Sequence, residues 1–161
     1  MRQRAASLAP LPPAVSSDPN VERVLELYEA FNARDFDRLV ALYDQNVEIL
    51  SFAAAVEGGK PYQGHAGLRE WYTNLVETFD MVIEAGAFLP YRKLVLSIPT
   101  VHVRVGGDLE SSYEQGILYA IPHGLITRSL GYKDVSSALD AMARILEATT
   151  RSHQRKPDLP R

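Results

Sequence analysis

The chain has 161 residues, of which 46% are hydrophobic and 23% charged, as expected for one soluble globular domain and not for a disordered chain. Its 17 Lys and Arg against 20 Asp and Glu leave a formal net charge of -3, which gives no general attraction to nucleic acid or anionic membranes. The lack of cysteine excludes disulfides, thiolate nucleophiles and thiolate-bound metals.

Composition divides the chain into an acidic body and two basic ends. Residues 1–19 form a proline-rich arm, 20–147 the folded body, and 148–161 a basic tail. Prolines interrupt the apolar residues of the arm, which therefore does not resemble a secretory signal peptide. No stretch of about 18 apolar residues occurs that would span a membrane. We expect a cytoplasmic protein with neither a membrane nor a nucleic-acid partner.

The first part of the body predicts three helices and one strand. Apolar residues recur at three- and four-residue steps over 21–31, where Asn20 can cap the helix. An aspartate-capped, shorter helix is expected over 36–44, followed by a strand over 47–52. A second long apolar stripe predicts a helix over 68–79.

The second part of the body changes to a period of two, which is typical of strands. The strand candidates are 82–88, 93–105, 111–121 and 125–132. The glycine pair at 106–107 predicts a hairpin turn, and 122–124 predicts another. Such short connections favour an antiparallel meander, and a closing helix is expected over 136–146. The order of elements indicates an α+β domain with helices on one face of a curved sheet.

Two segments carry a family resemblance: LYEAFNARDFDRLVALY, with its asparagine before an aspartate-capped helix, and GLITRSLGYKDVSSALDAM, with the last hairpin and strand. In this order they resemble the SnoaL-like branch of the nuclear transport factor 2 superfamily, over roughly residues 20–146. The resemblance implies a cystatin-like α+β barrel, in which a cone-shaped curved antiparallel sheet wraps around N-terminal helices and an apolar pocket. It also implies a hydrophobic small molecule as partner and a homodimer through the sheet. Relatives include polyketide cyclases, ketosteroid isomerases, limonene-epoxide hydrolases, dehydratases and proteins without catalytic activity.

The catalytic residues of the best-known relatives are largely missing. The general-base aspartate of ketosteroid isomerases falls on Ser51, and their oxyanion-hole aspartate falls on Gly116. Their helix-one tyrosine falls on Leu27, beside Tyr28, while an aspartate of the epoxide hydrolases falls on Gly131. Both mechanisms are therefore disfavoured for this chain.

The remaining candidate for proton transfer is Glu114. A two-residue turn at 106–107 would pair it with Pro99 and turn it toward the pocket, together with Ser112 and Val101. Burial there would raise the pKa of the carboxyl and make it a usable acid or base. Tyr28 or Tyr72 would be the hydrogen-bond donor. The alternative is that Glu114 is solvated at the rim or paired with a residue such as Arg128.

The predicted ligand-contacting residues are those that the expected register and the resemblance turn toward the pocket. They are Phe52, Trp71, Val101, Val103, Ser112, Gly116, Leu118 and Gly131. His102 is expected on the outer surface of the sheet, His123 in an exposed turn and His65 in a loop before the third helix. No histidine and carboxylate spacing supports a metal site, and no cofactor is expected.

Two functions follow from these expectations. The first is a cofactor-independent isomerase, cyclase or dehydratase that acts on a polyketide- or terpenoid-like molecule by acid–base chemistry. The alternative is a non-catalytic ligand-binding or dimerisation module of the same fold. Ile117, Tyr119 and Ile121, expected on the outer face of the sheet, would suit a homodimer contact.

Overall fold

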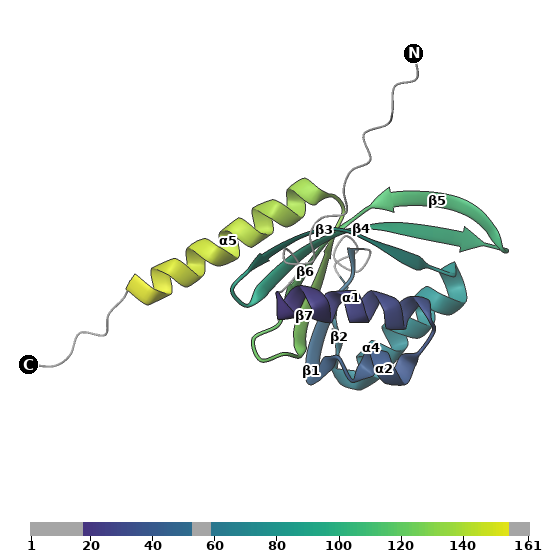
Figure 1. The fold of residues 1–161 in the computed structure, drawn as a ribbon, viewed down its shortest axis with the longest axis horizontal. Helices are drawn as coiled ribbons and strands as arrows, with labels where there is room; N and C mark the ends of the chain where they lie inside the picture. The colour runs from purple at the N-terminus through teal and green to yellow at the C-terminus, as the bar shows by residue number, and fades with distance from the viewer. Residues whose placement is uncertain (1–17, 53–58, 155–161) are drawn as a thin grey trace, which may run out of the picture.

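The computed structural model describes residues 18–52 and 59–154 and is an α+β fold built on one curved, seven-stranded sheet (Figure 1). Helices α1 (Pro19–Asn32), α2 (Phe36–Val40) and α4 (Gly64–Thr73) lie on one side of the sheet, and α5 (Val135–Gln154) lies on the other. The expected fold class is confirmed. The proline-rich arm falls outside the described residues, except for its last two positions.

Helix α1 places its apolar stripe in the core, where Val24 and Phe31 are fully buried. Its N-cap is Asp18, whose carboxylate accepts hydrogen bonds from the backbone amides of Asn20 and Val21. The expectation that Asn20 caps the helix is wrong. Its side-chain amide instead donates to the carbonyl of Ile121, 3.3 Å away, and joins the helix to the end of the sheet.

Helix α2 ends at Val40, and strand β1 (Tyr43–Leu50) begins where the sequence predicted more helix. Tyr43 pairs with Ile126 of strand β7 (Ile126–Tyr132), and the two strands run parallel. The sheet is therefore mixed, which corrects the expectation of a purely antiparallel sheet. Short connections predict only neighbours along the chain, and within the described residues β1 and β7 are separated by five other strands.

Helix α4 follows the two-residue strand β2 (Tyr62–Gln63) and continues into a π-helical turn, η2 (Asn74–Thr78). The helix predicted over 68–79 is thus found, but its last turn is wider than an α-helix. None of the η2 side chains is buried. The π-helical turn therefore leaves its side chains available to line a hollow beside the sheet.

The remaining strands are β3 (Val82–Tyr91), β4 (Leu94–Val105), β5 (Asp108–Glu114) and β6 (Gly116–Ala120). The expected single strand over 111–121 is divided into two strands at Gln115, where Pro99 of β4 has no N–H to donate, although the Gln115 amide still donates to the Pro99 carbonyl at 3.1 Å. One half of β4 pairs with β6 and the other half with β5. The turn at Gly106 and Gly107 is confirmed, with φ values of 66° and 86° that favour glycine.

Helix α5 packs on β4, β6 and β7, on the opposite side of the sheet from α1. Leu96, Leu118, Ala138 and Met142 form the buried cluster between them. The helix runs to Gln154, so the boundary expected at residue 147 falls inside it. Within residues 18–52 and 59–154, no helix combines the length and apolarity needed to cross a bilayer.

Candidate functional site

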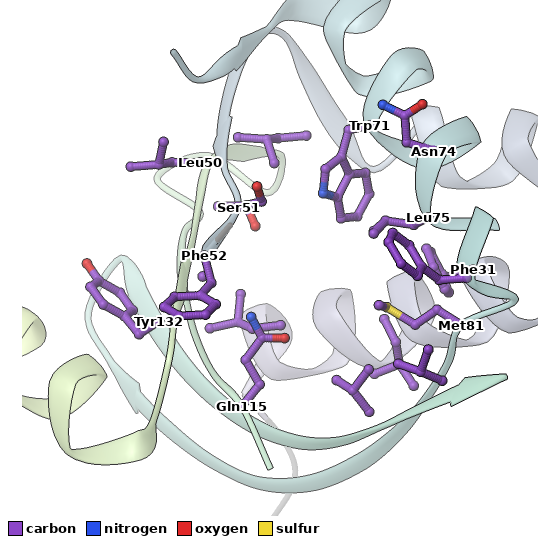
Figure 2. Close-up of a pocket in the computed structure, with 18 of the residues that line it drawn as sticks. Phe31, Leu50, Ser51, Phe52, Trp71, Asn74, Leu75, Met81, Gln115 and Tyr132 are labelled. Carbon is purple, nitrogen blue, oxygen red and sulfur yellow. The ribbon is translucent and has the colours of Figure 1, made fainter. Parts of the chain in front are cut away.

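A cavity of about 820 Å³ lies between the sheet and the helices α1, α4 and η2 (Figure 2). Figure 2 shows Trp71, Phe31, Met81, Gln115, Tyr132 and Phe52 arranged around an open centre. Its walls are mainly apolar, as in most small-molecule pockets. The lining residues are Leu27, Tyr28, Phe31, Ile49, Leu50, Ser51, Phe52, Tyr62, Trp71, Asn74, Leu75, Thr78, Phe79, Met81, Ile83, Val101, Val103, Tyr113, Glu114, Gln115, Ile117, Tyr119, Ser129, Gly131, Tyr132 and Lys133.

The floor of the cavity is a set of aromatic side chains that pack on one another. Tyr28 and Tyr119 meet edge to face, with ring centroids 6.4 Å apart. The centroid of the Phe31 ring lies 6.1 Å from that of Trp71 and 5.7 Å from that of the adjoining core residue Tyr72. Offset and edge-to-face contacts of this kind hold rings in fixed positions. The floor is therefore in place before any ligand enters.

Two cavity-lining tyrosines share a buried hydroxyl network. The Tyr119 hydroxyl donates to the Tyr28 oxygen at 3.2 Å, and the Tyr28 hydroxyl is 2.7 Å from that of Ser97, which is fully buried. If Ser97 also donates to Tyr28, the proton of Tyr28 is available to an acceptor in the cavity. Burial raises the pKa of Tyr28 to about 12 and that of Tyr119 well above its ordinary value. Both phenols are neutral donors at physiological pH.

Charged groups are scarce in the cavity. Among the described residues that line it, only Glu114 and Lys133 carry a charge, and both are exposed. Uncharged polar groups come from Asn74 on η2 and from Gln115 between β5 and β6. The site can therefore hold an apolar body and hydrogen-bond a few polar atoms on it.

The expected pairing of Glu114 with Pro99 is wrong because the register of the β4–β5 pair shifts by one residue, although Glu114 still borders the cavity. Val105 pairs with Asp108, as a two-residue turn requires, but Val103 pairs with Ser111, which leaves Glu110 as the extra residue of a β-bulge. Beyond the bulge, each side chain of β5 lies on the face of the sheet opposite to the one that the two-residue turn predicts. Tyr113 consequently lies opposite Val101, and Glu114 lies opposite Thr100 with its side chain exposed.

The same shift divides the predicted ligand-contacting residues into two groups. Phe52, Trp71, Val101, Val103 and Gly131 line the cavity. Ser112, Gly116 and Leu118 do not. Ser112 hydrogen-bonds His102 on the outer face, a Cβ on Gly116 would meet Ala138 of α5, and Leu118 belongs to the α5 cluster.

The two predicted hydrogen-bond donors also differ in position. Tyr28 lines the cavity, whereas Tyr72 is 9% exposed and packs in the core against Phe31 and Phe36. Ile117 and Tyr119, expected on the outer face, line the cavity, and Ile121 is 1% exposed. These three residues therefore cannot form the predicted dimer contact. A bulge-shifted register would have identified Tyr113, Gln115, Ile117 and Tyr119 as cavity residues, but no residue type marks the bulge.

Three histidines, His65, His102 and His123, are not among the residues that line the cavity. On the outer face, His102 Nδ1 is 2.7 Å from the Ser112 hydroxyl and its Nε2 is 2.8 Å from the Glu84 carboxylate. His123 is exposed in a turn, as expected, whereas His65 lies within α4, with its Nε2 3.1 Å from the Tyr43 carbonyl. In the described parts of the chain, no group of three or more His, Cys, Asp or Glu residues is arranged to hold a metal ion.

Solved structures with the same fold show what this architecture resembles. TerC, crystallised with polyporic acid, is 21% identical, with a TM-score of 0.64 over 76% of this chain and 97% of its own. A Burkholderia pseudomallei NTF2-like protein of unknown function is 18% identical, with a TM-score of 0.64 over 76% and 96%. A Mycobacterium tuberculosis protein in complex with estradiol-17β-hemisuccinate is 17% identical, with a TM-score of 0.64 over 73% and 95%.

At these identities the structural likeness establishes the fold alone. A search of curated proteins finds no sequence that matches this chain. The family model of the SnoaL-like domain, however, matches residues 24–128, which include most of α1, the cavity-facing strands β1 and β3–β6, and the start of β7. The chain therefore belongs to the SnoaL-like domain family.

Proposed function

We propose that this domain binds a largely hydrophobic, ring-containing small molecule in its cavity, with the Tyr28 hydroxyl donating a hydrogen bond to an acceptor atom of that molecule. The observation that carries the proposal is an apolar cavity of about 820 Å³ beside a buried hydroxyl network. Pockets of this size, with few polar groups, suit drug-sized ligands. The ligands crystallised with TerC and with the Mycobacterium tuberculosis protein are of that size and support the choice of test ligands.

Binding can be followed through the protein itself, because Trp71 is the chain's single tryptophan and lines the cavity. We expect polyporic acid or estradiol to quench its fluorescence and to raise the melting temperature of the domain. Ile117→Phe should place a bulkier side chain in the cavity and weaken binding, as measured by calorimetry. Leu89→Phe is the matched control, since Leu89 lies outside the cavity and is 48% exposed. Equal affinities of both variants would contradict the assignment of the cavity.

A second function, acid–base catalysis on the bound molecule, is favoured by one observation. The neutral Tyr28 phenol, a hydrogen-bond donor, and the Glu114 carboxylate at the cavity rim border the same cavity. Such a pair would promote enolisation of a ketone, which is the shared step of isomerase, cyclase and dehydratase chemistry. Because Glu114 is exposed, it would have to turn toward the ligand when the complex forms.

Enolisation has a readout that does not require the natural substrate. A ketone ligand with a hydrogen next to its carbonyl should exchange that hydrogen in D₂O, as followed by NMR. We expect Glu114→Gln to slow the exchange about 100-fold while ligand affinity is retained. Glu110→Gln, on the same strand, is the control. If exchange is no faster with the wild-type protein than without it, catalysis is ruled out for that ligand and the domain acts as a binding module.

A further inference from the structure

The aromatic residues of the cavity wall differ sharply in how well they are packed. Tyr28, Phe31 and Tyr119 expose between 0% and 3% of their surface, so their positions are fixed by the protein. Phe52, Phe79 and Tyr113 also line the cavity, yet they expose 38%, 43% and 44%. The three side chains are largely aromatic, and each one borders the cavity. A bound ligand would pack against these exposed side chains.

These three residues come from elements far apart in the chain. Phe52 follows the end of β1, Phe79 follows the π-helical turn η2, and Tyr113 lies on β5. Two of them depend on irregular backbone: Tyr113 faces the cavity because of the bulge at Glu110, and Phe79 directly follows η2. Bulges and π-helical turns often occur next to functional sites. Their presence here indicates that these rings are directed toward the cavity at the expense of regular structure.

We propose that Phe52, Phe79 and Tyr113 are the specificity-determining residues of the cavity and clamp a flat aromatic ligand between them. This proposal rests on the proposed function and deepens it. Flat aromatic rings gain offset or edge-to-face contacts with aromatic side chains, whereas a puckered saturated ring has no π system for such contacts. Among the described residues of the lining, Glu114 and Lys133 alone are charged; they are exposed and opposite in sign, so recognition depends on ring shape more than on ligand charge.

Leu89 and Tyr91 show that exposure alone does not define the clamp. Both are about as exposed as the clamp residues, at 48% and 46%, but neither lines the cavity. Tyr91 on β3 therefore provides a matched control. It has the same chemistry and exposure as Tyr113 without a place in the site.

The test compares two ligands with one carbon skeleton, phenanthrenol and perhydrophenanthrenol, by isothermal titration calorimetry of the full chain. We expect the flat ligand to bind about tenfold more tightly. Phe79→Leu and Tyr113→Leu keep apolar volume but remove the flat face, so each should weaken phenanthrenol binding three- to tenfold and perhydrophenanthrenol binding less than twofold. Tyr91→Leu should change neither affinity. Far-UV circular dichroism confirms that each variant is folded.

The outcomes separate the clamp from the proposed function. Equal affinities of the two ligands, or equal losses for both in Phe79→Leu, would overturn the clamp and leave a cavity that selects only for apolar volume. If wild-type protein binds neither ligand, and neither raises its melting temperature, the proposed function itself fails and the clamp fails with it. A loss in Tyr91→Leu as large as that in Tyr113→Leu would also overturn the clamp.

Discussion

Strand β6 has two faces that pack in opposite ways. Gly116 and Leu118 lie against α5 in a closed cluster, whereas Ile117 and Tyr119 border the hollow. Consecutive residues of one five-residue strand thus serve a solid core on one side and a cavity on the other. The difference shows that α5 supplies packing that the cavity side lacks, so the domain can keep a hollow in a stable fold.

The largest expected contrast comes from truncating one side chain on each face. Leu118→Ala should destabilise the domain by about 3 kcal/mol, because Leu118 is 2% exposed and its removal leaves a void under α5. Ile117→Ala should lower the free energy of unfolding by only about 1 kcal/mol, since Ile117 already borders the cavity. Urea denaturation measures both. Equal losses would mean that the cavity is filled in solution.

The next largest effect is that alkaline pH should lower the free energy of unfolding through the buried tyrosines. Burial raises the pKa of Tyr28 to about 12, and those of Tyr43 and Tyr119 are raised by the same cause. An unfolded tyrosine ionises near pH 10, so the stabilisation is complete below pH 10 and is lost between pH 10 and about 12, by about 2 to 3 kcal/mol for Tyr28. Denaturation at several pH values tests this, and Tyr28→Phe should flatten the decline.

Replacing Gly116 and Gly131 by alanine compares the packed side of the sheet with the cavity side a second time. A Cβ at Gly116 would meet the Cβ of Ala138 and lie 3.2 Å from the Asp134 carbonyl, so Gly116→Ala must displace α5 and should cost about 2 kcal/mol. At Gly131 the nearest atoms are the amide end of the flexible Gln115, at 3.0 Å, and the backbone nitrogen of Phe52, at 3.2 Å, and no other Cβ among the described residues comes as close as that of Ala138 does to Gly116. Thermal melting should show a clearly smaller loss for Gly131→Ala, and the reverse order would contradict the packed and hollow assignment.

The smallest expected effect concerns one buried hydroxyl. Tyr43 is 2% exposed, and its hydroxyl has no hydrogen-bond partner within the described parts of the chain. Removing it by Tyr43→Phe should therefore stabilise the domain by about 1 kcal/mol. Tyr28→Phe should have the opposite sign, because it takes a partner from the fully buried Ser97 hydroxyl. Destabilisation in Tyr43→Phe would point to a buried water on that oxygen.

Much of the fold could be predicted because periodicity and short turns are local. The stripe in α1, the alternation of Val101 and Val103 in β4, and the glycine turn at 106–107 each depend on neighbouring residues. The parallel pairing of β1 with β7 is non-local, and the bulge at Glu110 has no distinguishing residue. That single extra residue explains why Ser112, Gly116 and Leu118 lie outside the cavity, whereas the predicted residues Val101 and Val103 on the partner strand line it.

The division of β4 between β5 and β6 has a consequence for solubility. Within the described residues, β5 pairs only with β4, so the sheet has an open edge at β5 as well as at β2 and β3. An open edge invites strand addition by another copy of the chain, and natural proteins discourage this with charged side chains. Along β5, Asp108, Glu110 and Glu114 supply three negative charges in seven residues. Strand β5, which helps to line the cavity, thus carries negative charges that oppose β-sheet aggregation between copies of the chain.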